Sequence, residues 1–153
     1  MANKKKIDQE KYTSILECDI KKEDFVHAGE GSSQIKTRLL KLGYSPQTIR
    51  RVAIASYEAE LNIVIHSVGG ELLAGIRPDK VQIVARDRGP GIADIDKAMV
   101  KGYSTAPEHI RQMGFGAGMG LANIKNCCDE FEIKSSKEGT KVTMVIFENK
   151  AGL

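Results

Sequence analysis

The pattern of hydrophobic positions predicts a long helix in the first half of the chain. Apolar residues recur at helical spacing from position 52 to position 65. Ser45 and Pro46 stand just before this stretch; serine is a common helix cap and proline suits the first helical turn. We therefore predict a helix from Pro46 to about Ser67, and its hydrophobicity indicates that it packs against a sheet.

The remaining pattern predicts five strands and three further helices. Apolar runs bounded by glycine, proline or charged residues predict strands at 12–18, 72–76, 81–85, 131–135 and 141–147. Helical spacing predicts helices at 24–42, clearest at 34–42, and at 94–100 and 121–130. Residues 1–11 are expected to form a polar tail, followed by one domain at 12–150. Because strands and helices do not alternate regularly, this order favours an α+β two-layer sandwich, with helices on one face of a mixed, mostly antiparallel sheet.

Composition and charge exclude several functional classes. The 153 residues are 41% hydrophobic and 28% charged, as in one globular domain, and the net charge of +3 does not call for nucleic acid as a partner. The basic run Lys4–Lys6 is not followed by the apolar stretch of a secretory signal, and no apolar run is long enough to span a membrane. The three cysteines, Cys18, Cys127 and Cys128, are an odd number and predict a reducing, cytoplasmic location rather than a disulfide framework. The acidic pair Asp129–Glu130 is interpreted as solvated surface.

Glu58 and Asn62 are the first candidates for chemistry. They are four residues apart within the predicted long helix and therefore project from one face. One interpretation is structural, with Asn62 hydrogen-bonded to a neighbouring carbonyl and Glu58 at the rim. In the functional interpretation the Asn62 oxygen ligates Mg²⁺ and the Glu58 carboxylate accepts a proton.

A second candidate is Asp87, which ends a predicted strand and is followed by Gly89 and Gly91. Asp-x-Gly is commonly only a turn. Its functional form is a carboxylate acceptor at the base of a pocket, where an exocyclic amine such as that of adenine donates to Asp87. The glycines then let a planar ring approach the backbone.

The third candidate is a glycine run directly before a predicted helix. Gly114, Gly116, Gly118 and Gly120 alternate with other residues, so backbone N–H groups there can hold an anion. The spacing matches neither the dinucleotide-binding fingerprint nor the P-loop. A flexible hinge is the structural alternative.

Taken in order, these motifs resemble the four sequence boxes of the GHKL ATPase superfamily, with Gly139-Thr140 as the fourth. The resemblance covers roughly residues 12–147 and implies the Bergerat ATP-binding fold. Within the superfamily, residues 87–95, residues 102–105 and the glycine run look most like the bacterial anti-sigma factor and switch serine kinase branch.

The resemblance also implies a role for each matching residue. Glu58 is the expected general base, Asn62 the expected Mg²⁺ ligand, and Asp87 the expected acceptor of the adenine amine. Thr140 is expected to back the adenine site, and residues 102–115 to form a lid over the triphosphate. The residues implied in nucleotide binding are Asn62, Asp87, Gly89, Gly91, Ser104, Thr105, Gly114, Gly116, Ala117, Gly118, Met119, Gly120 and Thr140.

Two functions follow from the resemblance as expectations. The first is an ATP-dependent serine/threonine protein kinase of a bacterial partner-switching pathway, which binds ATP and Mg²⁺ and phosphorylates a STAS-type antagonist protein. The second is an anti-sigma factor or nucleotide-gated binding module with little or no catalysis. Neither requires nucleic acid or a membrane, and a homodimer is compatible with both.

Overall fold

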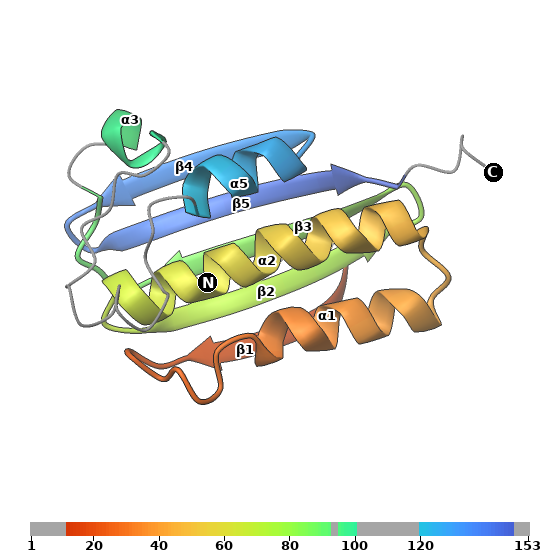
Figure 1. The fold of residues 1–153 in the computed structure, drawn as a ribbon, viewed down its shortest axis with the longest axis horizontal. Helices are drawn as coiled ribbons and strands as arrows, with labels where there is room; N and C mark the ends of the chain where they lie inside the picture. The colour runs from red at the N-terminus through yellow and green to blue at the C-terminus, as the bar shows by residue number, and fades with distance from the viewer. Residues whose placement is uncertain (1–11, 93–94, 101–119, 149–153) are drawn as a thin grey trace.

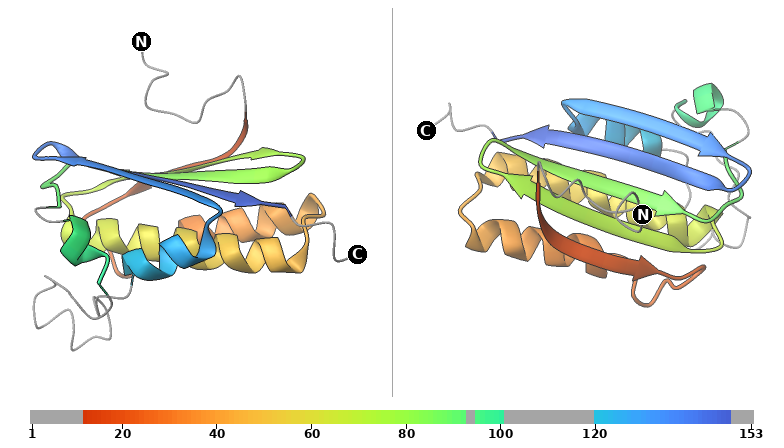
Figure 2. Two further views of the ribbon diagram at one scale, coloured as in Figure 1. Left: turned by 90° about the horizontal axis from the view of Figure 1, so that it is seen from above. Right: turned by 180° about the vertical axis from the view of Figure 1, so that it is seen from behind.

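The chain folds into one sheet with helices on one of its faces (Figures 1 and 2). The structure is a computed structural model that describes residues 12–92, 95–100 and 120–148. The elements are β1 (Thr13–Ile20), α1 (Glu30–Lys41), α2 (Pro46–His66), β2 (Gly70–Arg77), β3 (Lys80–Asp87), α3 (Ile95–Ala98), α5 (Gly120–Cys127), β4 (Glu130–Ser136) and β5 (Gly139–Phe147).

The five strands form a sheet in the order β1-β2-β3-β5-β4, and each neighbouring pair is antiparallel. Strand β5 therefore lies between β3 and β4 and joins the two hairpins of the sheet. In the left view of Figure 2, α1, α2 and α5 lie together below the sheet. The predicted α+β sandwich with helices on one face of a mostly antiparallel sheet is confirmed.

The core lies between the sheet and α2. Alternate side chains of β2, β3 and β5 point toward the helices, because successive residues of a strand face opposite sides. Each fully buried aliphatic side chain contributes about 1.5–3 kcal/mol relative to exposure. The residues with no exposed surface in this core include Leu72, Ala74, Val81, Ile83, Met144 and Ile146 from the strands and Val52 and Ala55 from α2.

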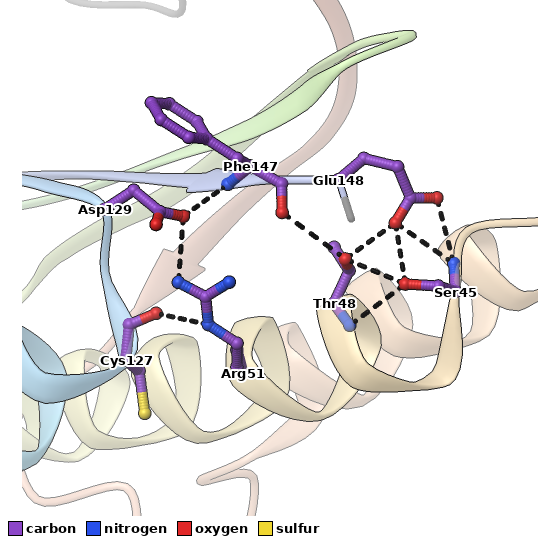
Figure 3. A network of polar contacts seen from close by, with 7 residues as sticks. All are labelled: Ser45, Thr48, Arg51, Cys127, Asp129, Phe147 and Glu148. Carbon is purple, nitrogen blue, oxygen red and sulfur yellow. Dashed lines mark hydrogen bonds and ion pairs between the residues drawn. The ribbon is translucent and has the colours of Figure 1, made fainter. Parts of the chain in front are cut away.

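A polar network fixes the start of α2 to the end of the sheet (Figure 3). Ser45 caps the helix by accepting from the Thr48 N–H at 3.3 Å, and Pro46 follows it, as predicted. The Glu148 carboxylate accepts from the Ser45 N–H at 2.9 Å and from the Thr48 hydroxyl at 2.6 Å. The residue that follows β5 therefore holds the first turn of α2 in place.

Arg51 forms a second link between α2 and the far end of the chain (Figure 3). Its guanidinium donates to the Cys127 carbonyl at 3.0 Å and to the Asp129 carboxylate at 2.8 Å. The same Asp129 oxygen accepts from the Phe147 N–H at 2.7 Å. Asp129 is exposed, as expected for solvated surface, and it also connects α2 to β5.

Two helix boundaries differ from the prediction. Helix α1 begins at Glu30 rather than at position 24, after Gly29 with a φ of 97°. Helix α5 ends at Cys127, and Glu130 already belongs to β4. The other elements lie within a few residues of their predicted bounds.

All three cysteines are free thiols, and none of the helices in the described ranges is long and apolar enough to cross a bilayer.

Candidate functional site

The first group of candidate residues surrounds Asp87 at the end of β3. Asp87 Oδ1 accepts from the Gly89 N–H and from the Thr140 N–H, both at 2.9 Å. The first bond is the tight turn that Asp-x-Gly favours. The second bond forms because β5 lies beside β3, so that the first residues of β5 are close to the end of β3. Within the described part of the chain, Oδ2 of Asp87 receives no hydrogen bond, so this oxygen is available to accept from a ligand.

Thr140 is buried behind Asp87. Its hydroxyl lies 2.8 Å from the Ser135 hydroxyl, which also accepts from the Ile92 N–H at 2.7 Å. Ser135, on β4, thus joins the β4–β5 hairpin to the loop that follows β3. Sequence analysis did not identify Ser135, because a serine in a strand carries no signal until its cross-strand partner is known.

The glycines near Asp87 are required by close backbone contacts. A Cβ at Gly91 would come well under 3.0 Å from the Ser136 carbonyl oxygen, and one at Gly139 would do the same at the Asp87 carbonyl. Gly89 has a φ of 105°, which other residues rarely adopt. The glycines therefore allow the segment after β3 and the β4–β5 turn to pack closely together beside Asp87.

The second group lies on the C-terminal half of α2, where Asn62 and Glu58 face the start of α5. A Cβ at Gly120 would lie 3.1 Å from Asn62 Oδ1 and 3.3 Å from Glu58 Oε2. Because Gly120 has no side chain, the first turn of α5 packs directly against this pair. Of the glycine run, Gly120 is the member whose position the structure describes, and it lies against Asn62 and Glu58.

Burial is the main influence on the Glu58 carboxyl and raises its pKa above the ordinary value. A hydrogen bond from the Asn123 side chain on α5 acts in the opposite direction. A carboxylate with a raised pKa binds a proton more readily than an ordinary glutamate does. Asn123 was not among the residues identified from the sequence, although it lies one helical turn after Gly120.

The two groups lie toward the same end of the molecule. The Val68 N–H, just beyond α2, donates to the Gly89 carbonyl at 3.0 Å, and the Ser67 hydroxyl donates to the same carbonyl at 3.3 Å. In Figure 1 the C-terminal end of α2, the end of β3 and the β4–β5 turn are gathered at the left. The remaining predicted nucleotide-binding residues lie outside the described ranges: Ser104, Thr105, Gly114, Gly116, Ala117, Gly118 and Met119.

The sequence of the chain matches a known family. Residues 33–146 match the model of the histidine kinase-like ATPase domain, which is more than half of the chain. The chain belongs to the histidine kinase-like ATPase family. Domains of this family bind nucleotide. The side chains of Asp87 at the end of β3 and of Asn62 and Glu58 on α2 are chemically suited to such a ligand.

The similar proteins include a serine/threonine-protein kinase and anti-sigma F factors. The serine/threonine-protein kinase RsbT of Bacillus subtilis (strain 168) is 33% identical over 110 residues, which are 69% of this chain and 77% of that protein. The anti-sigma F factor of Thermoanaerobacter sp. (strain X514) is 29% identical over 143 residues, 87% of this chain and 93% of that protein.

A solved structure shares the fold. It contains the RsbU and RsbW domains of Rv1364c from Mycobacterium tuberculosis, and matches with a TM-score of 0.56 at 18% identity. The match covers 86% of this chain and 32% of that one. The chain therefore shares its fold with a domain of that protein.

Proposed function

We propose that this chain is an ATP-dependent serine/threonine protein kinase of a bacterial partner-switching pathway, acting in the cytoplasm on a STAS-type antagonist protein. The observation that carries the proposal is the placement of Glu58. It is a half-buried carboxylate with a raised pKa, and it lies beside Asn62 against the first residue of α5. The similarity to RsbT, a named serine/threonine kinase, supports the same activity.

The residues present fit a magnesium nucleotide. Asn62 offers an amide oxygen, a ligand type that Mg²⁺ accepts, at the point where α2 meets the start of α5 at Gly120. Asp87 offers the adenine amine its Oδ2, which accepts no hydrogen bond from the residues that the structure describes. When bound by Asn62, Mg²⁺ supplies positive charge that neutralises the phosphate oxygens.

The chain's own residues bind and orient the reacting groups, and one of them accepts a proton. Glu58 receives the proton of the attacking serine or threonine hydroxyl while the hydroxyl oxygen bonds to the γ-phosphorus. The bond from that phosphorus to the β–γ bridging oxygen breaks, and ADP leaves with its electron pair. Such transfers depend mainly on positioning and electrostatics, which is why a fixed carboxylate matters here.

The test is phosphoryl transfer by the purified chain. It is incubated with γ-labelled ATP and a STAS-domain protein encoded beside its gene, and labelled protein is measured. Glu58→Gln should lower the transfer rate by about 10²-fold or more, the usual contribution of a general base. Glu138→Gln, in the exposed β4–β5 turn, is the matched control. Equal transfer by Glu58→Gln and the wild type would reject the proposed role.

A second candidate function is an anti-sigma factor, favoured by the long match to the Thermoanaerobacter anti-sigma F factor. In this case the chain holds a sigma factor and releases it to the antagonist. Co-purification with a sigma factor, lost when the unphosphorylated antagonist is added, would support this role. Transfer activity without any sigma-factor association would restrict the chain to the kinase role.

A further inference from the structure

Ser135 on β4 joins the two segments that lie around Asp87. It stands opposite Thr140 in the pairing of β4 with β5, and the two hydroxyl oxygens are 2.8 Å apart. The Ser135 oxygen also accepts from the Ile92 N–H at 2.7 Å. A Cβ at Gly91 would lie 2.6 Å from this oxygen, so the Ser135 hydroxyl is enclosed between the β4–β5 hairpin and the segment that follows β3.

The direction of the hydrogen bond between the two hydroxyls follows from the partners of Ser135. A serine hydroxyl has one proton to donate and two lone pairs that accept. The Ile92 N–H occupies one lone pair, and the Thr140 oxygen is the acceptor that the described residues offer to the Ser135 proton. The reverse direction would leave that proton without an acceptor among them. Ser135 therefore donates to Thr140, and the bond that it accepts from Ile92 strengthens the bond that it donates.

This direction leaves the proton of the Thr140 hydroxyl to be donated elsewhere. The Thr140 residue is buried, with 6% of its surface exposed. Its hydroxyl has Ser135 as its hydrogen-bonding partner within the described ranges, so its own proton has no acceptor there. A buried donor that stays unpaired costs free energy. A bound base with a ring nitrogen can accept this proton and remove that cost.

Thr140 and Asp87 then offer a donor beside an acceptor. The two residues are joined by the bond from the Thr140 N–H to Asp87 Oδ1, and Oδ2 accepts no hydrogen bond from the described residues. Adenine presents its amine, a donor, next to the ring nitrogen N1, an acceptor. Guanine presents the reverse order, a carbonyl oxygen next to a ring N–H. The pair of Thr140 and Asp87 therefore matches adenine and opposes guanine.

We propose that Ser135 is a positioning residue that contributes to adenine specificity: it donates to Thr140 Oγ1 and thereby commits the Thr140 hydroxyl to donate to N1 of the base. Ser135 acts through Thr140 and does not itself contact the nucleotide. This inference deepens the nucleotide binding of the proposed function and rests on it.

Two ATP analogues separate this role from a merely structural one. 1-Deaza-ATP lacks the ring nitrogen N1, and purine riboside triphosphate lacks the amine. By isothermal titration calorimetry, the wild type should bind 1-deaza-ATP about fivefold more weakly than ATP, the effect of one neutral hydrogen bond. In Ser135→Ala this ratio should fall to about twofold or less, because the Thr140 hydroxyl is then free to rotate. The loss of affinity for purine riboside triphosphate should stay the same, because it depends on Asp87.

The control is Ser14→Ala, which removes an exposed serine from strand β1 and should keep both affinity ratios. Ser135→Cys retains a weaker donor of similar shape and should give an intermediate ratio of ATP to 1-deaza-ATP affinity. The proposal is overturned if Ser135→Ala keeps the wild-type ratio for 1-deaza-ATP. It is also overturned if Ser135→Ala loses the discrimination against both analogues equally, since that pattern reports a disturbed site rather than a change at Thr140.

Amide hydrogen exchange in the nucleotide-free chain tests the hydrogen bonds of Ser135 by themselves. The Ile92 N–H should exchange about tenfold faster in Ser135→Ala than in the wild type, because its acceptor is lost, and at the wild-type rate in Ser14→Ala. Unchanged exchange at Ile92 overturns the role assigned to Ser135. A wild type that binds no ATP rejects the proposed nucleotide site and the specificity role with it, while the exchange rates still show whether Ser135 holds the segment after β3.

Discussion

The Thr140 backbone N–H donates to Asp87 Oδ1 at 2.9 Å, across fifty-three residues of sequence. Together with the Gly89 N–H on the same oxygen, this bond fixes the carboxylate. Oδ2 receives no hydrogen bond from the residues that the structure describes, so Oδ1 is the structural oxygen and Oδ2 is the one proposed to bind the adenine amine.

Asp87→Asn should weaken adenine recognition while preserving the fold. The asparagine carbonyl can replace Oδ1, but the amide group then presents donors where the adenine amine needs an acceptor. Loss of a hydrogen bond to a charged group costs about 1.5–3 kcal/mol, or roughly ten- to a hundredfold in Kd for ATP. Isothermal titration calorimetry measures the affinity for ATP and for GTP. Asp79→Asn, in the exposed β2–β3 turn, is the control. Equal wild-type affinity for ATP and GTP would contradict the assigned role of Asp87.

Asn62→Ala should remove the magnesium-dependent part of ATP binding. The amide oxygen faces Gly120 and is the expected metal ligand, so its loss should lower Mg-ATP affinity by about a hundredfold or more. Calorimetry is run with Mg²⁺ and with EDTA, and circular dichroism checks the fold. Asn126→Ala on α5 controls for the loss of an exposed asparagine. Equal Mg²⁺ dependence in Asn62→Ala and the wild type would assign the metal to other ligands.

Gly91→Ala should destabilise the domain and impair nucleotide binding. The added methyl group would collide with the Ser136 carbonyl oxygen, and backbone cannot move aside as a flexible side chain can. Overpacking of this kind costs about 1–3 kcal/mol, measurable by urea denaturation. Gly43→Asn is the control, because Gly43 has open space around it and asparagine tolerates its positive φ of 83°. Equal stability of the two variants would show that the segment of Gly91 can shift freely.

The sequence predicted the helices and strands well, because they depend on local patterns. The long helix, for example, begins at Pro46 after its Ser45 cap and ends at His66, within one residue of the prediction. The motif residues Glu58 and Asn62 lie on one face because their spacing of four is a property of any helix.

Contacts between distant segments could not be predicted in the same way. The order of the chain does not reveal that β5 lies between β3 and β4, and the bond from Thr140 to Asp87 depends on that position. Likewise, Ser135 becomes a candidate only when β4 is seen to pair with β5. The predicted start of α1 was too early because the residues before Gly29 form a loop, whose end is held by Glu60 from another helix.

Glu60→Ala should destabilise the domain more than Glu60→Gln. The buried Glu60 carboxylate accepts from the Gly29 N–H at 2.9 Å and the Ser32 N–H at 3.0 Å, and it caps the start of α1. Alanine leaves these donors unpaired, which should cost about 3 kcal/mol, whereas glutamine keeps one acceptor. Urea denaturation measures the free energy of unfolding. A loss below about 1 kcal/mol in Glu60→Ala would show that water or another group takes over the cap.

Glu58→Gln should stabilise the folded chain at neutral pH, although it removes the proposed base. Burial raises the pKa of Glu58 in the folded state above its ordinary value of about 4.3. The stability that this group contributes is therefore fully present below pH 4.3 or so and is lost as the pH rises through the raised pKa. Glutamine is never ionised, so the variant should melt at a higher temperature than the wild type at pH 7–8, and the difference should shrink as the pH falls toward 4. Thermal denaturation across this range measures it, and Glu138→Gln reports the general effect of removing one exposed carboxylate. If the stability of Glu58→Gln relative to the wild type is lower at pH 8 than at pH 5, the ionised Glu58 stabilises the fold. That result would contradict a Glu58 pKa raised by burial.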